Sequence, residues 1–338
     1  MATPALRWFG SADVIASMPP LEERLRLAEK TMVALATPDA SQLPPKIAIH
    51  PRATDSFVHA MPAHLRDADP GGDLVGMKWV AGYATNNALG LPGISAVVVL
   101  NDPETGLPVA MLDGAPITAE RTAAVSGVAV RRFGPQAGPG GWPAGSPVHV
   151  AIIGAGVQGH SHLPMFGGVL PGCDVHLYDR DSAKASALAQ AAWNTPGISD
   201  VVVHDSAREA VEFSDVVLTA AAFGPASERQ SMTNSWLRPG ATVIPIDYAT
   251  YCNAEVARQA ALFLVDHRAQ YLANRDAGNF DNYPDPGAMI GEAILAGTKR
   301  PAGRVVVTHL GVGLTDLVFA DAIVRAAVAA GRGTVLTR

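Results

Sequence analysis

Three closely spaced glycines carry the clearest chemical signal in this sequence. Residues 148–153 are an apolar, β-branched run typical of a buried parallel strand, and Gly154, Gly156 and Gly159 follow it. Gly154 permits a tight turn, Gly156 lets the backbone approach a pyrophosphate, and Gly159 lets a helix pack close to the strand. The N-terminus of that helix offers unpaired N–H groups to phosphate charge. The spacing therefore predicts a dinucleotide-binding turn.

An acidic residue, Asp179, closes the next predicted strand about 20 residues after the last glycine. A carboxylate at this place can bind a ribose 2′-hydroxyl and repels a 2′-phosphate, so Asp179 favours NAD over NADP. Arg180 could instead bind that phosphate, with a solvated surface arginine as the simpler interpretation. The same glycine pattern also occurs with flavins, and a turn that merely packs is the alternative without a ligand.

Composition excludes several classes of partner. The 338 residues suffice for one large or two ordinary domains, and 48% of them are apolar while 17% are charged. The net charge of −6, without a basic run, argues against a nucleic-acid partner. No apolar run approaches the ~18 residues of a membrane span, and the first residues lack the apolar stretch of a signal peptide. Cys173 and Cys252 show no metal or redox spacing, so we expect a cytoplasmic protein without a metal site.

The chain changes its pattern near the middle. Before residue 134 we expect an α+β region with a helix over 21–36, strands over 46–52, 57–61, 74–80, 94–101 and 109–112, and a helix over 117–133 capped by Thr118. Residues 134–147 are rich in Gly and Pro and are predicted to be the domain boundary. Beyond them, strands alternate with helices, the pattern of a doubly wound parallel sheet. Those strands are predicted at 148–153, 174–178, 201–204, 216–219, 242–246, 262–265 and 305–308.

The predicted fold class is therefore α/β, with a Rossmann-type doubly wound parallel sheet domain and an α+β substrate-binding and dimerisation domain. A final helix over 315–330 is apolar all round and should be buried, on the first domain or between subunits. We expect residues 1–146, completed by 314–338, to form the first domain, and residues 147–313 to form the NAD(P)-binding domain.

Several segments together resemble the ornithine cyclodeaminase/μ-crystallin family over roughly residues 45–330. They are Gly76-Met-Lys-Trp-Val-Ala-Gly-Tyr83, Asn101-Asp-Pro-Glu-Thr-Gly106, Ile117-Thr-Ala-Glu-Arg-Thr-Ala-Ala124, the glycine turn, Asp247 and Gly311-Val-Gly-Leu-Thr-Asp316. The resemblance implies a two-domain homodimer that binds a nicotinamide cofactor. It also implies an α-amino or α-imino acid as substrate, with chemistry at the Cα–N bond.

The resemblance assigns the substrate carboxylate to three cations, Arg52, Lys78 and Arg121. Arginine offers a forked, bidentate partner for a carboxylate. Lys78 lies between apolar neighbours, where an unpaired ammonium is costly, although a snorkelling edge-strand lysine is the alternative. Arg121 is expected in the first turn of its helix, where the dipole disfavours a cation, so an anionic ligand would explain it. An ion pair with Glu120 is the other interpretation.

Asp247 ends the strand over 242–246, at the carboxyl edge where α/β proteins bind ligands. The resemblance implies that this aspartate contacts the substrate amine and handles its proton, with a helix cap as the alternative. It also places Val157 and Gln158 at the pyrophosphate turn and Thr219 beside the nicotinamide. His309 and Leu310 match a segment that approaches substrate and nicotinamide, and His309 is either a proton carrier or a hydrogen-bonded structural histidine.

The preferred hypothesis is an NAD-dependent cyclodeaminase acting on a small, basic α-amino acid through an imino acid, with no net redox change. One alternative is an NAD(P)H-dependent imine or ketimine reductase, or an amino-acid dehydrogenase, which uses the same residues for half of that cycle. A further alternative is a non-catalytic, μ-crystallin-like binder of a small ligand. The chain differs from the cyclodeaminase pattern just after Asp247, where it reads Tyr248-Ala-Thr rather than a Pro-Gly turn.

Overall fold

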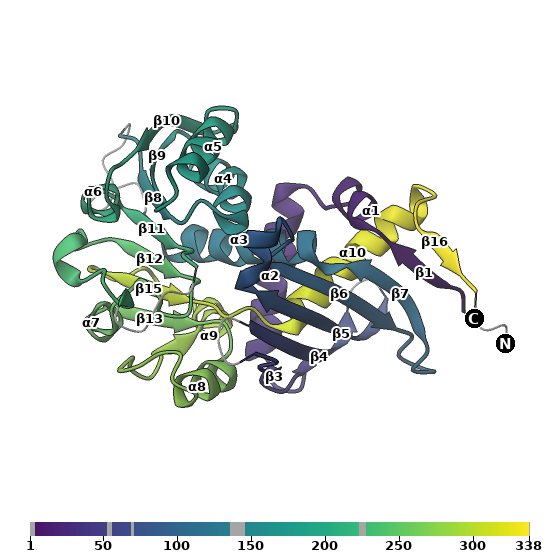
Figure 1. Ribbon diagram of the computed structural model, residues 1–338. Helices are drawn as coiled ribbons and strands as arrows, with labels where there is room; N and C mark the ends of the chain where they lie inside the picture. Colours follow the sequence, from purple (N-terminus) through teal and green to yellow (C-terminus); the bar gives the residue numbers. More distant parts are fainter. Residues whose placement is uncertain (1–3, 53–55, 69–70, 136–145, 223–227, 338) are drawn as a thin grey trace. The chain divides into compact units, whose positions relative to one another are not determined.

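The computed structural model of the protein describes residues 4–52, 56–68, 71–135, 146–222 and 228–337. The chain forms two compact units (Figure 1). Unit 1 contains Met1–Arg121 and Gly311–Arg338, and unit 2 contains Thr122–Leu310. The C-terminal segment therefore returns to the first unit.

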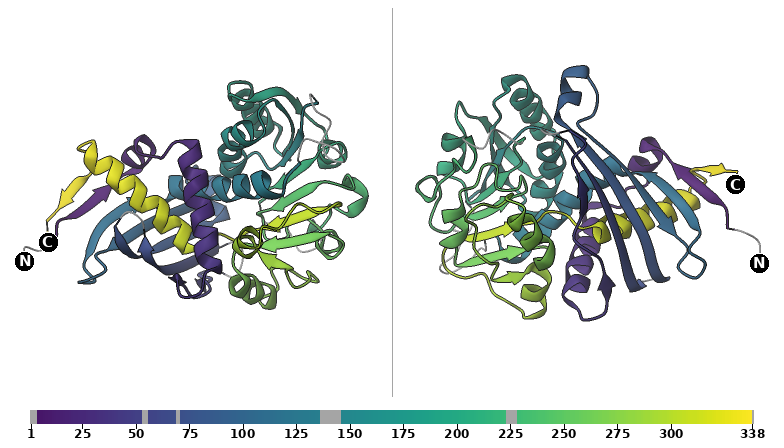
Figure 2. Two further views of the ribbon diagram at one scale, coloured as in Figure 1. Left: turned by 180° about the vertical axis from the view of Figure 1, so that it is seen from behind. Right: turned by 60° about the horizontal axis from the view of Figure 1, so that its bottom comes forward.

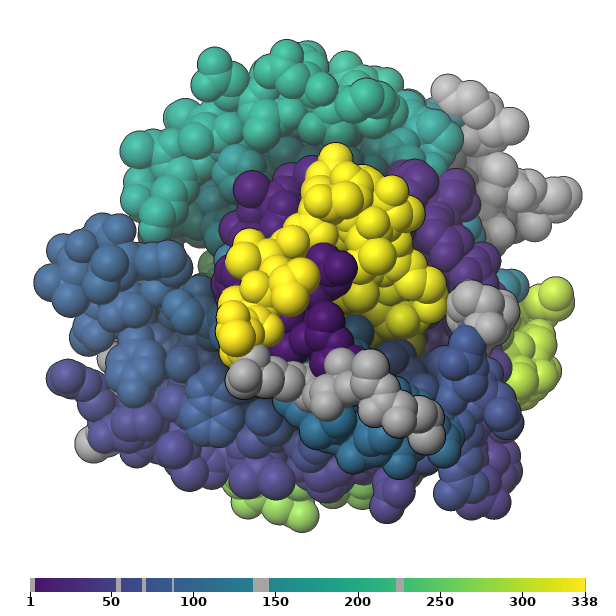
Figure 3. Space-filling model, turned by 90° about the vertical axis from the view of Figure 1, so that its right-hand side faces the viewer, coloured from purple at the N-terminus to yellow at the C-terminus, as the bar shows by residue number. Residues whose placement is uncertain are grey.

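Unit 1 is built on a mixed sheet with the strand order β16-β1-β7-β6-β5-β4-β2, and β3 pairs with β4. Neighbouring strands run antiparallel except for the parallel pair β1 and β7. The strands are β1 (Leu6–Phe9), β2 (Ser41–Gln42), β3 (Ile47–Ile49), β4 (Ser56–Ala68), β5 (Gly72–Tyr83), β6 (Ile94–Asn101), β7 (Pro108–Asp113) and β16 (Thr334–Leu336). The two ends of the chain lie side by side in β1 and β16, as Figure 3 shows.

One face of this sheet is covered by helix α10 (Gly313–Ala329), which contacts β4, β5 and β6 (Figure 2). Gly76 allows the close approach, since a Cβ there would lie 2.2 Å from the carbonyl oxygen of Val99 and 3.1 Å from Leu317. The apolar last helix packs on unit 1 and is buried over residues 313–320, whereas Arg325, Ala326, Val328 and Ala329 are exposed, so the prediction that it is buried holds for its first half only. The other helices of this unit are α1 (Ser11–Ala16), α2 (Leu21–Ala36) and the 3₁₀ helix η1 (Ala84–Leu89).

Helix α3 (Gly114–Phe133) begins three residues before the predicted start at 117. The prediction that Thr118 caps it is wrong, because the Thr118 hydroxyl lies inside the helix and donates to the carbonyl of Gly114 at 2.7 Å. Arg121 consequently lies beyond the first turn, so the argument from the helix dipole does not apply to it.

The boundary between the units falls inside α3 and not in the Gly/Pro-rich stretch over 134–147, most of which lies outside the described residues. The second half of α3 belongs to unit 2 because it packs there. Val130 is part of that unit's core, and the Thr242 hydroxyl donates to the carbonyl of Phe133 at 3.3 Å.

Unit 2 contains a parallel sheet with the order β10-β9-β8-β11-β12-β15-β13-β14. Its strands are β8 (His149–Ile153), β9 (Cys173–Tyr178), β10 (Ile198–Val203), β11 (Val216–Thr219), β12 (Thr242–Pro245), β13 (Leu262–Val265), β14 (Ala288–Met289) and β15 (Val305–Thr308). The helices are α4 (Val157–Val169), α5 (Ser182–Trp193), α6 (Ala207–Glu212), the 3₁₀ helix η3 (Asn234–Trp236), α7 (Ala254–Arg258), α8 (Arg268–Asp276) and α9 (Ile290–Leu295). The predicted fold class is confirmed, and the predicted strands of this region are present with ends shifted by a few residues.

The order of these strands brings four separate segments to one edge of the sheet. β8, β11, β12 and β15 are consecutive neighbours and parallel, so their carboxyl ends lie together. The residues that follow them are Gly154, Ala220, Ile246 and His309. This edge is where α/β sheets bind ligands. None of the described helices is long and apolar enough to cross a bilayer.

Candidate active site

The turn between β8 and α4 has the geometry that the glycine spacing predicts. Gly154 has a positive φ of 112°, and a Cβ there would lie 2.5 Å from the carbonyl oxygen of Ala220. A Cβ on Gly159 would lie 2.5 Å from the carbonyl oxygen of Gly154. Both glycines are therefore required by the path of the chain itself.

Gly156 differs from these two because it is the N-cap of α4 and a Cβ on it would meet nothing within 4 Å. No side chain caps this helix, Val157 is exposed at its start, and the buried Oε1 of Gln158 has no hydrogen-bond partner among the described residues. Open space in front of uncapped N–H groups suits a pyrophosphate. The residues present therefore fit a dinucleotide.

The two kinds of glycine predict two different mutant phenotypes. Gly154→Ala should lower the free energy of unfolding by about 1–3 kcal/mol, because alanine would be forced into a positive φ. Gly156→Ala should leave thermal unfolding unchanged but weaken NADH binding by about tenfold or more, since its methyl group would occupy the space of the ligand. Thermal unfolding and NADH titration separate the two effects. Unchanged NADH affinity in Gly156→Ala would mean that the turn does not bind the cofactor.

Asp179 follows β9 directly and faces the glycine turn. Its Oδ2 accepts a hydrogen bond from the backbone N–H of Ala155 at 2.7 Å, and its Oδ1 accepts one from Asp181 at 2.9 Å. These two bonds hold the carboxylate beside the turn, as expected for a group that binds a ribose. The side chain of Arg180 is 71% exposed and lies 3.8 Å from Glu228, which supports its interpretation as a surface arginine.

Asp247 lies two residues beyond β12 and is buried. Its Oδ2 accepts a hydrogen bond from the N–H of Ala221 at 3.2 Å, while Oδ1 has no hydrogen-bond partner within the part of the chain that the structure describes. The helix-cap alternative does not hold, because Asn253 caps the next helix, α7. Burial raises the pKa of Asp247 to about 6, and the Ala221 N–H opposes that rise.

The segment after Asp247 is strained, which the sequence did not indicate. Tyr248 and Ala249 both have positive φ values, 55° and 57°, although neither is glycine. Such conformations cost about 1–3 kcal/mol each and gather at functional sites. The Tyr248 hydroxyl donates to the carbonyl of Leu310 at 3.4 Å, so the predicted substrate-binding residue Leu310 connects to this segment through its backbone. Thr219 is buried at the end of β11, the strand next to β12.

His309 is a buried, hydrogen-bonded histidine directly after β15. Its Nε2 lies 2.9 Å from the hydroxyl of Ser126. This hydrogen bond is the kind expected for a structural histidine.

In unit 1, Lys78 and Arg121 meet on a carboxylate that sequence reasoning did not select. Lys78 Nζ donates to Asp316 Oδ1 at 2.8 Å and to the Thr118 hydroxyl at 3.2 Å, and Arg121 Nε donates to the same oxygen of Asp316 at 3.0 Å. All three charged side chains are buried. Asp316 is the last residue of the segment 311–316 that resembles the family. A carboxylate in the first turn of an otherwise apolar helix was the feature of the sequence that could have indicated its role.

Two cations and one carboxylate leave this cluster with one uncompensated positive charge. Burial lowers the pKa of Lys78 to about 7, and the neighbouring Asp316 opposes that fall. The second oxygen of Asp316 has no hydrogen-bond partner among the described residues. A monoanionic carboxylate would balance the charge, so the cluster suits the ligand that the resemblance implies.

The glycines around Asp316 give the cations their room. A Cβ on Gly311, which has φ 75°, would lie 2.0 Å from Nη1 of Arg121, and one on Gly313 would lie 2.3 Å from the carbonyl oxygen of Met61. Glycine is therefore needed at 311 because the chain passes the Arg121 side chain, and at 313 because it contacts the backbone of Met61 in β4.

Two earlier interpretations of these cations are corrected. Arg52 is exposed in a bend after β3, which ends at Ile49, so the prediction that it ends a strand is wrong. Its guanidinium makes no described contact with the Lys78 cluster, and its backbone N–H donates to Ser56 Oγ at 2.9 Å. The proposed pair of Arg121 with Glu120 is also wrong, because Glu120 pairs with Arg24 of α2.

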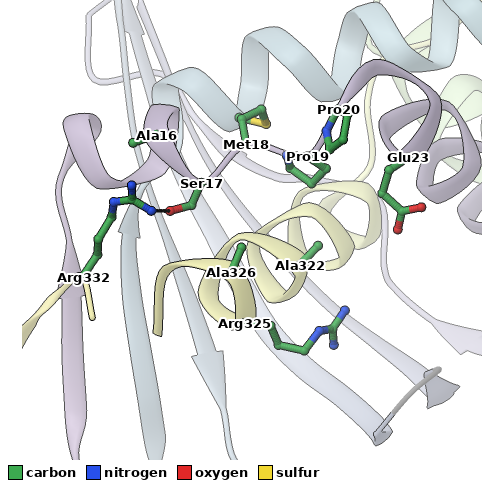
Figure 4. Close-up of a pocket in the computed structure, with 10 residues that line it drawn as sticks. All are labelled: Ala16, Ser17, Met18, Pro19, Pro20, Glu23, Ala322, Arg325, Ala326 and Arg332. Atoms are coloured by element: carbon green, nitrogen blue, oxygen red, sulfur yellow. Dashed lines mark hydrogen bonds between the residues drawn. The ribbon is translucent and has the colours of Figure 1, made fainter. Parts of the chain in front are cut away.

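A surface pocket between the α1–α2 loop and α10 is lined by none of these residues (Figure 4). It is lined by residues that include Ser17, Arg325 and Arg332, and Arg332 donates to Ser17 Oγ at 3.4 Å.

In the part of the chain that the structure covers, no group of three or more His, Cys, Asp or Glu residues could hold a metal ion. Burial raises the pKa of Cys173 and of Cys252 to about 12, so neither thiol is a nucleophile at neutral pH.

Comparison with known proteins identifies the family. The model of the ornithine cyclodeaminase/mu-crystallin family matches residues 12–320, so the chain belongs to this family, as its motifs indicated. The chain is 32% identical over 341 residues to the nodulation efficiency protein NfeD of Rhizobium meliloti, covering 98% of each. It is 28% identical over 313 residues to the ketimine reductase mu-crystallin of Mus musculus, covering 90% of each.

A solved relative has the same fold. The Δ¹-pyrroline-2-carboxylate reductase of Thermococcus litoralis, in complex with NADH and L-proline, superposes with a TM-score of 0.81. It is 24% identical in sequence, and the match covers 98% of this chain and all of that one. That relative carries NADH, in agreement with the nicotinamide cofactor predicted for this chain.

Proposed function

We propose that this protein is an NADH-dependent reductase of a small α-imino acid, which it converts to the α-amino acid. The observation that carries the proposal is the buried carboxyl group of Asp247. One of its oxygens has no hydrogen bond among the described residues, and it lies two residues after β12, the strand between β11 and β15. The relatives that are named as ketimine and pyrroline-carboxylate reductases support this class of reaction.

In this proposal the substrate carboxylate binds to Lys78 and Arg121. The hydrogen bond that the structure describes for the Arg121 guanidinium uses Nε, on Asp316, and we propose that the two terminal nitrogens bind the planar carboxylate. Lys78 has three N–H donors, of which two are used within the described part of the chain, on Asp316 and Thr118. Asp316 holds both cations in place and prevents two positive charges from standing alone in a buried site.

Asp247 supplies the proton in this reaction. With a pKa near 6, an appreciable fraction of the carboxyl is protonated in neutral solution, and it can donate to the nitrogen of the imine. In the reverse direction the carboxylate holds the ammonium and takes its proton. NADH, when bound, supplies the hydride for the imine carbon. We propose NAD rather than NADP because the Asp179 carboxylate is fixed beside the glycine turn.

The cyclodeaminase reaction remains the second candidate, because the family description includes it and it uses the same residues. It removes hydride from a basic amino acid, forms a ring by attack of the distal amine, releases ammonia and returns the hydride. The cofactor is not consumed over that cycle.

One paired assay separates these candidates. In the first arm, NADH or NADPH is mixed with a cyclic imino acid and the loss of absorbance is followed. In the second, NAD⁺ is mixed with ornithine or lysine and ammonia is measured. Oxidation of NADH in the first arm supports the reductase, and ammonia without net NADH establishes the cyclodeaminase. Ligand binding without turnover in both arms would indicate the non-catalytic binder.

The proposed acid predicts a pH dependence. A proton donor must be protonated, so kcat/KM for imine reduction should fall as the pH rises above about 6, where Asp247 ionises. Lys78 loses its charge above about 7, which weakens carboxylate binding in the same direction. Oxidation of the amino acid should instead rise with pH through the ionisation of Asp247. Stopped-flow rates between pH 5 and pH 9 check this, and a reduction rate that rises with pH would contradict it.

We also propose that the protein is a homodimer through the face of the unit 1 sheet that lies opposite α10. Lys78 faces α10, so its neighbour Trp79 faces the other side. Trp79 is opposite Ala60, which is opposite Ile47, and Ile49 follows on β3. Trp79 is 46% exposed, and Ile47 and Ile49 are 57% and 56% exposed. These exposed apolar side chains on adjacent strands could pack against the same side chains of a second copy of the chain.

Trp79→Arg should therefore shift the protein from dimer to monomer, because a charge would be buried in an apolar interface. Light scattering coupled to size exclusion gives the mass. Trp193→Arg is the matched control, since Trp193 is an exposed tryptophan of unit 2. A wild-type monomer, or a Trp79→Arg dimer, would contradict the proposed interface.

Both cysteines are free thiols, which supports the predicted cytoplasmic location.

A further inference from the structure

A chain of four hydrogen-bonded groups runs through the interior of unit 2, and no step proposed above uses it. His162 of α4 lies with its Nδ1 2.6 Å from the carbonyl oxygen of Gln158 and its Nε2 2.8 Å from the hydroxyl of Ser126. The same hydroxyl lies 2.9 Å from Nε2 of His309. His162, Ser126 and His309 are all buried.

The direction of each bond follows from the chemistry of its atoms. The carbonyl of Gln158 can only accept, so Nδ1 of His162 carries a proton and donates. Neutral His162 then has a lone pair at Nε2, which accepts from the Ser126 hydroxyl. That hydroxyl has one proton, so its oxygen must accept from Nε2–H of His309.

The opposite direction would need a doubly protonated His162. Burial lowers the pKa of His162 to about 4, so the neutral ring dominates at neutral pH. The ring is also held by Phe166, whose centroid lies 5.7 Å away, and Gln158 and His162 are one turn apart on α4. Both ends of the His162 ring are therefore determined by rigid neighbours.

We propose that Ser126 and His162 are positioning residues that hold His309 as the Nε2–H tautomer, so that its Nδ1 carries no proton. With both rings neutral, the direction of the hydrogen-bond chain gives this tautomer. Its consequence for the reaction rests on the proposed function: His309 follows β15 at the ligand edge, and in this tautomer its Nδ1 cannot deliver a proton there. The proton step then belongs to Asp247.

The tautomer can be measured without turnover. Full-length protein labelled with ¹⁵N-histidine is examined by long-range ¹H–¹⁵N correlation without cofactor, and His309→Gln assigns the His309 signals among the ten histidines. The expected result at neutral pH is a protonated Nε2 and an unprotonated Nδ1. A protonated Nδ1 would overturn the inference. Absence of reductase activity beside the expected spectrum would reject the proposed function and leave the tautomer standing.

Ser126→Ala removes the central link and should produce a mixture of His309 tautomers. The matched control is Ser161→Ala, because Ser161 is a buried serine of α4 whose hydroxyl donates to the same Gln158 carbonyl at 3.2 Å but lies outside the chain. His162→Gln, which keeps a donor and an acceptor, should retain the wild-type tautomer and serves if Ser126→Ala does not fold. An unchanged tautomer in Ser126→Ala would show that Ser126 does not position His309.

A kinetic readout separates positioning from simple packing. The pH profile of imine reduction in His309→Gln should keep the ionisation near pH 6 that belongs to Asp247. In Ser126→Ala, part of the His309 rings should carry the proton on Nδ1, so the rate of reduction should fall less steeply above pH 6 than in the wild type. Loss of the ionisation near pH 6 in His309→Gln would make His309 the acid and overturn the inference.

Discussion

Asp247→Asn is expected to lower the turnover number for imine reduction by about 10³-fold, the usual range for loss of a general acid. The amide is nearly the same shape and can still accept from the Ala221 N–H, so the backbone should not move. It cannot serve as the same acid, however. The Kd for NADH should stay within about twofold, because the cofactor turn around Gly156 is untouched.

The control for this change is Asp215→Asn. Asp215 is also a buried aspartate of unit 2 whose pKa is raised by burial, but it precedes β11 and pairs with Arg238. Its replacement should cost some stability and leave turnover nearly intact. Single-turnover kinetics with thermal unfolding separate the two effects. A folded Asp247→Asn enzyme within tenfold of the wild-type rate would remove Asp247 from the proton step.

Lys78→Met is expected to lower kcat/KM for the imino acid by about 10²- to 10³-fold, as for removal of one partner of a buried charge pair. Methionine keeps much of the apolar stem, but the remaining Arg121 and Asp316 have no net charge. The substrate carboxylate would then lose its compensating charge as well as one donor. The effect should appear mainly as a higher KM, with NADH affinity unchanged.

Lys184→Met provides the matched control, since Lys184 is an exposed lysine of unit 2 that lies 3.9 Å from Asp181. A surface pair of this kind contributes little, so its loss should change neither KM nor the turnover number. Substrate saturation curves for the two variants make the comparison. Equal KM values in Lys78→Met and wild type would mean that the carboxylate binds elsewhere.

The sequence by itself determined those structural features that depend only on a few neighbouring residues. The glycine turn is predictable because only glycine tolerates the positive φ at 154 and the close contacts with backbone at 154 and 159. The alternation of apolar runs with helices determined the parallel sheet of unit 2, and the apolar first half of α10 determined the burial of residues 313–320. The type and order of the elements follow from such patterns within each segment.

Only the tertiary structure decided which distant side chains meet. Asp316 is 238 residues from Lys78 and 195 from Arg121, and His309 is 183 residues from Ser126. The residue types at these positions have many possible partners. The packing of α10 on the unit 1 sheet brings Asp316 to Lys78, and the packing within unit 2 brings His309 to Ser126. The same reason explains why the prediction for Arg52 differs from the structure. The family motif grouped Arg52 with Lys78 and Arg121, but the structure describes no contact of its guanidinium with them. A spacing within one strand or helix is a property of the local chain, whereas a contact between elements depends on how their buried faces pack.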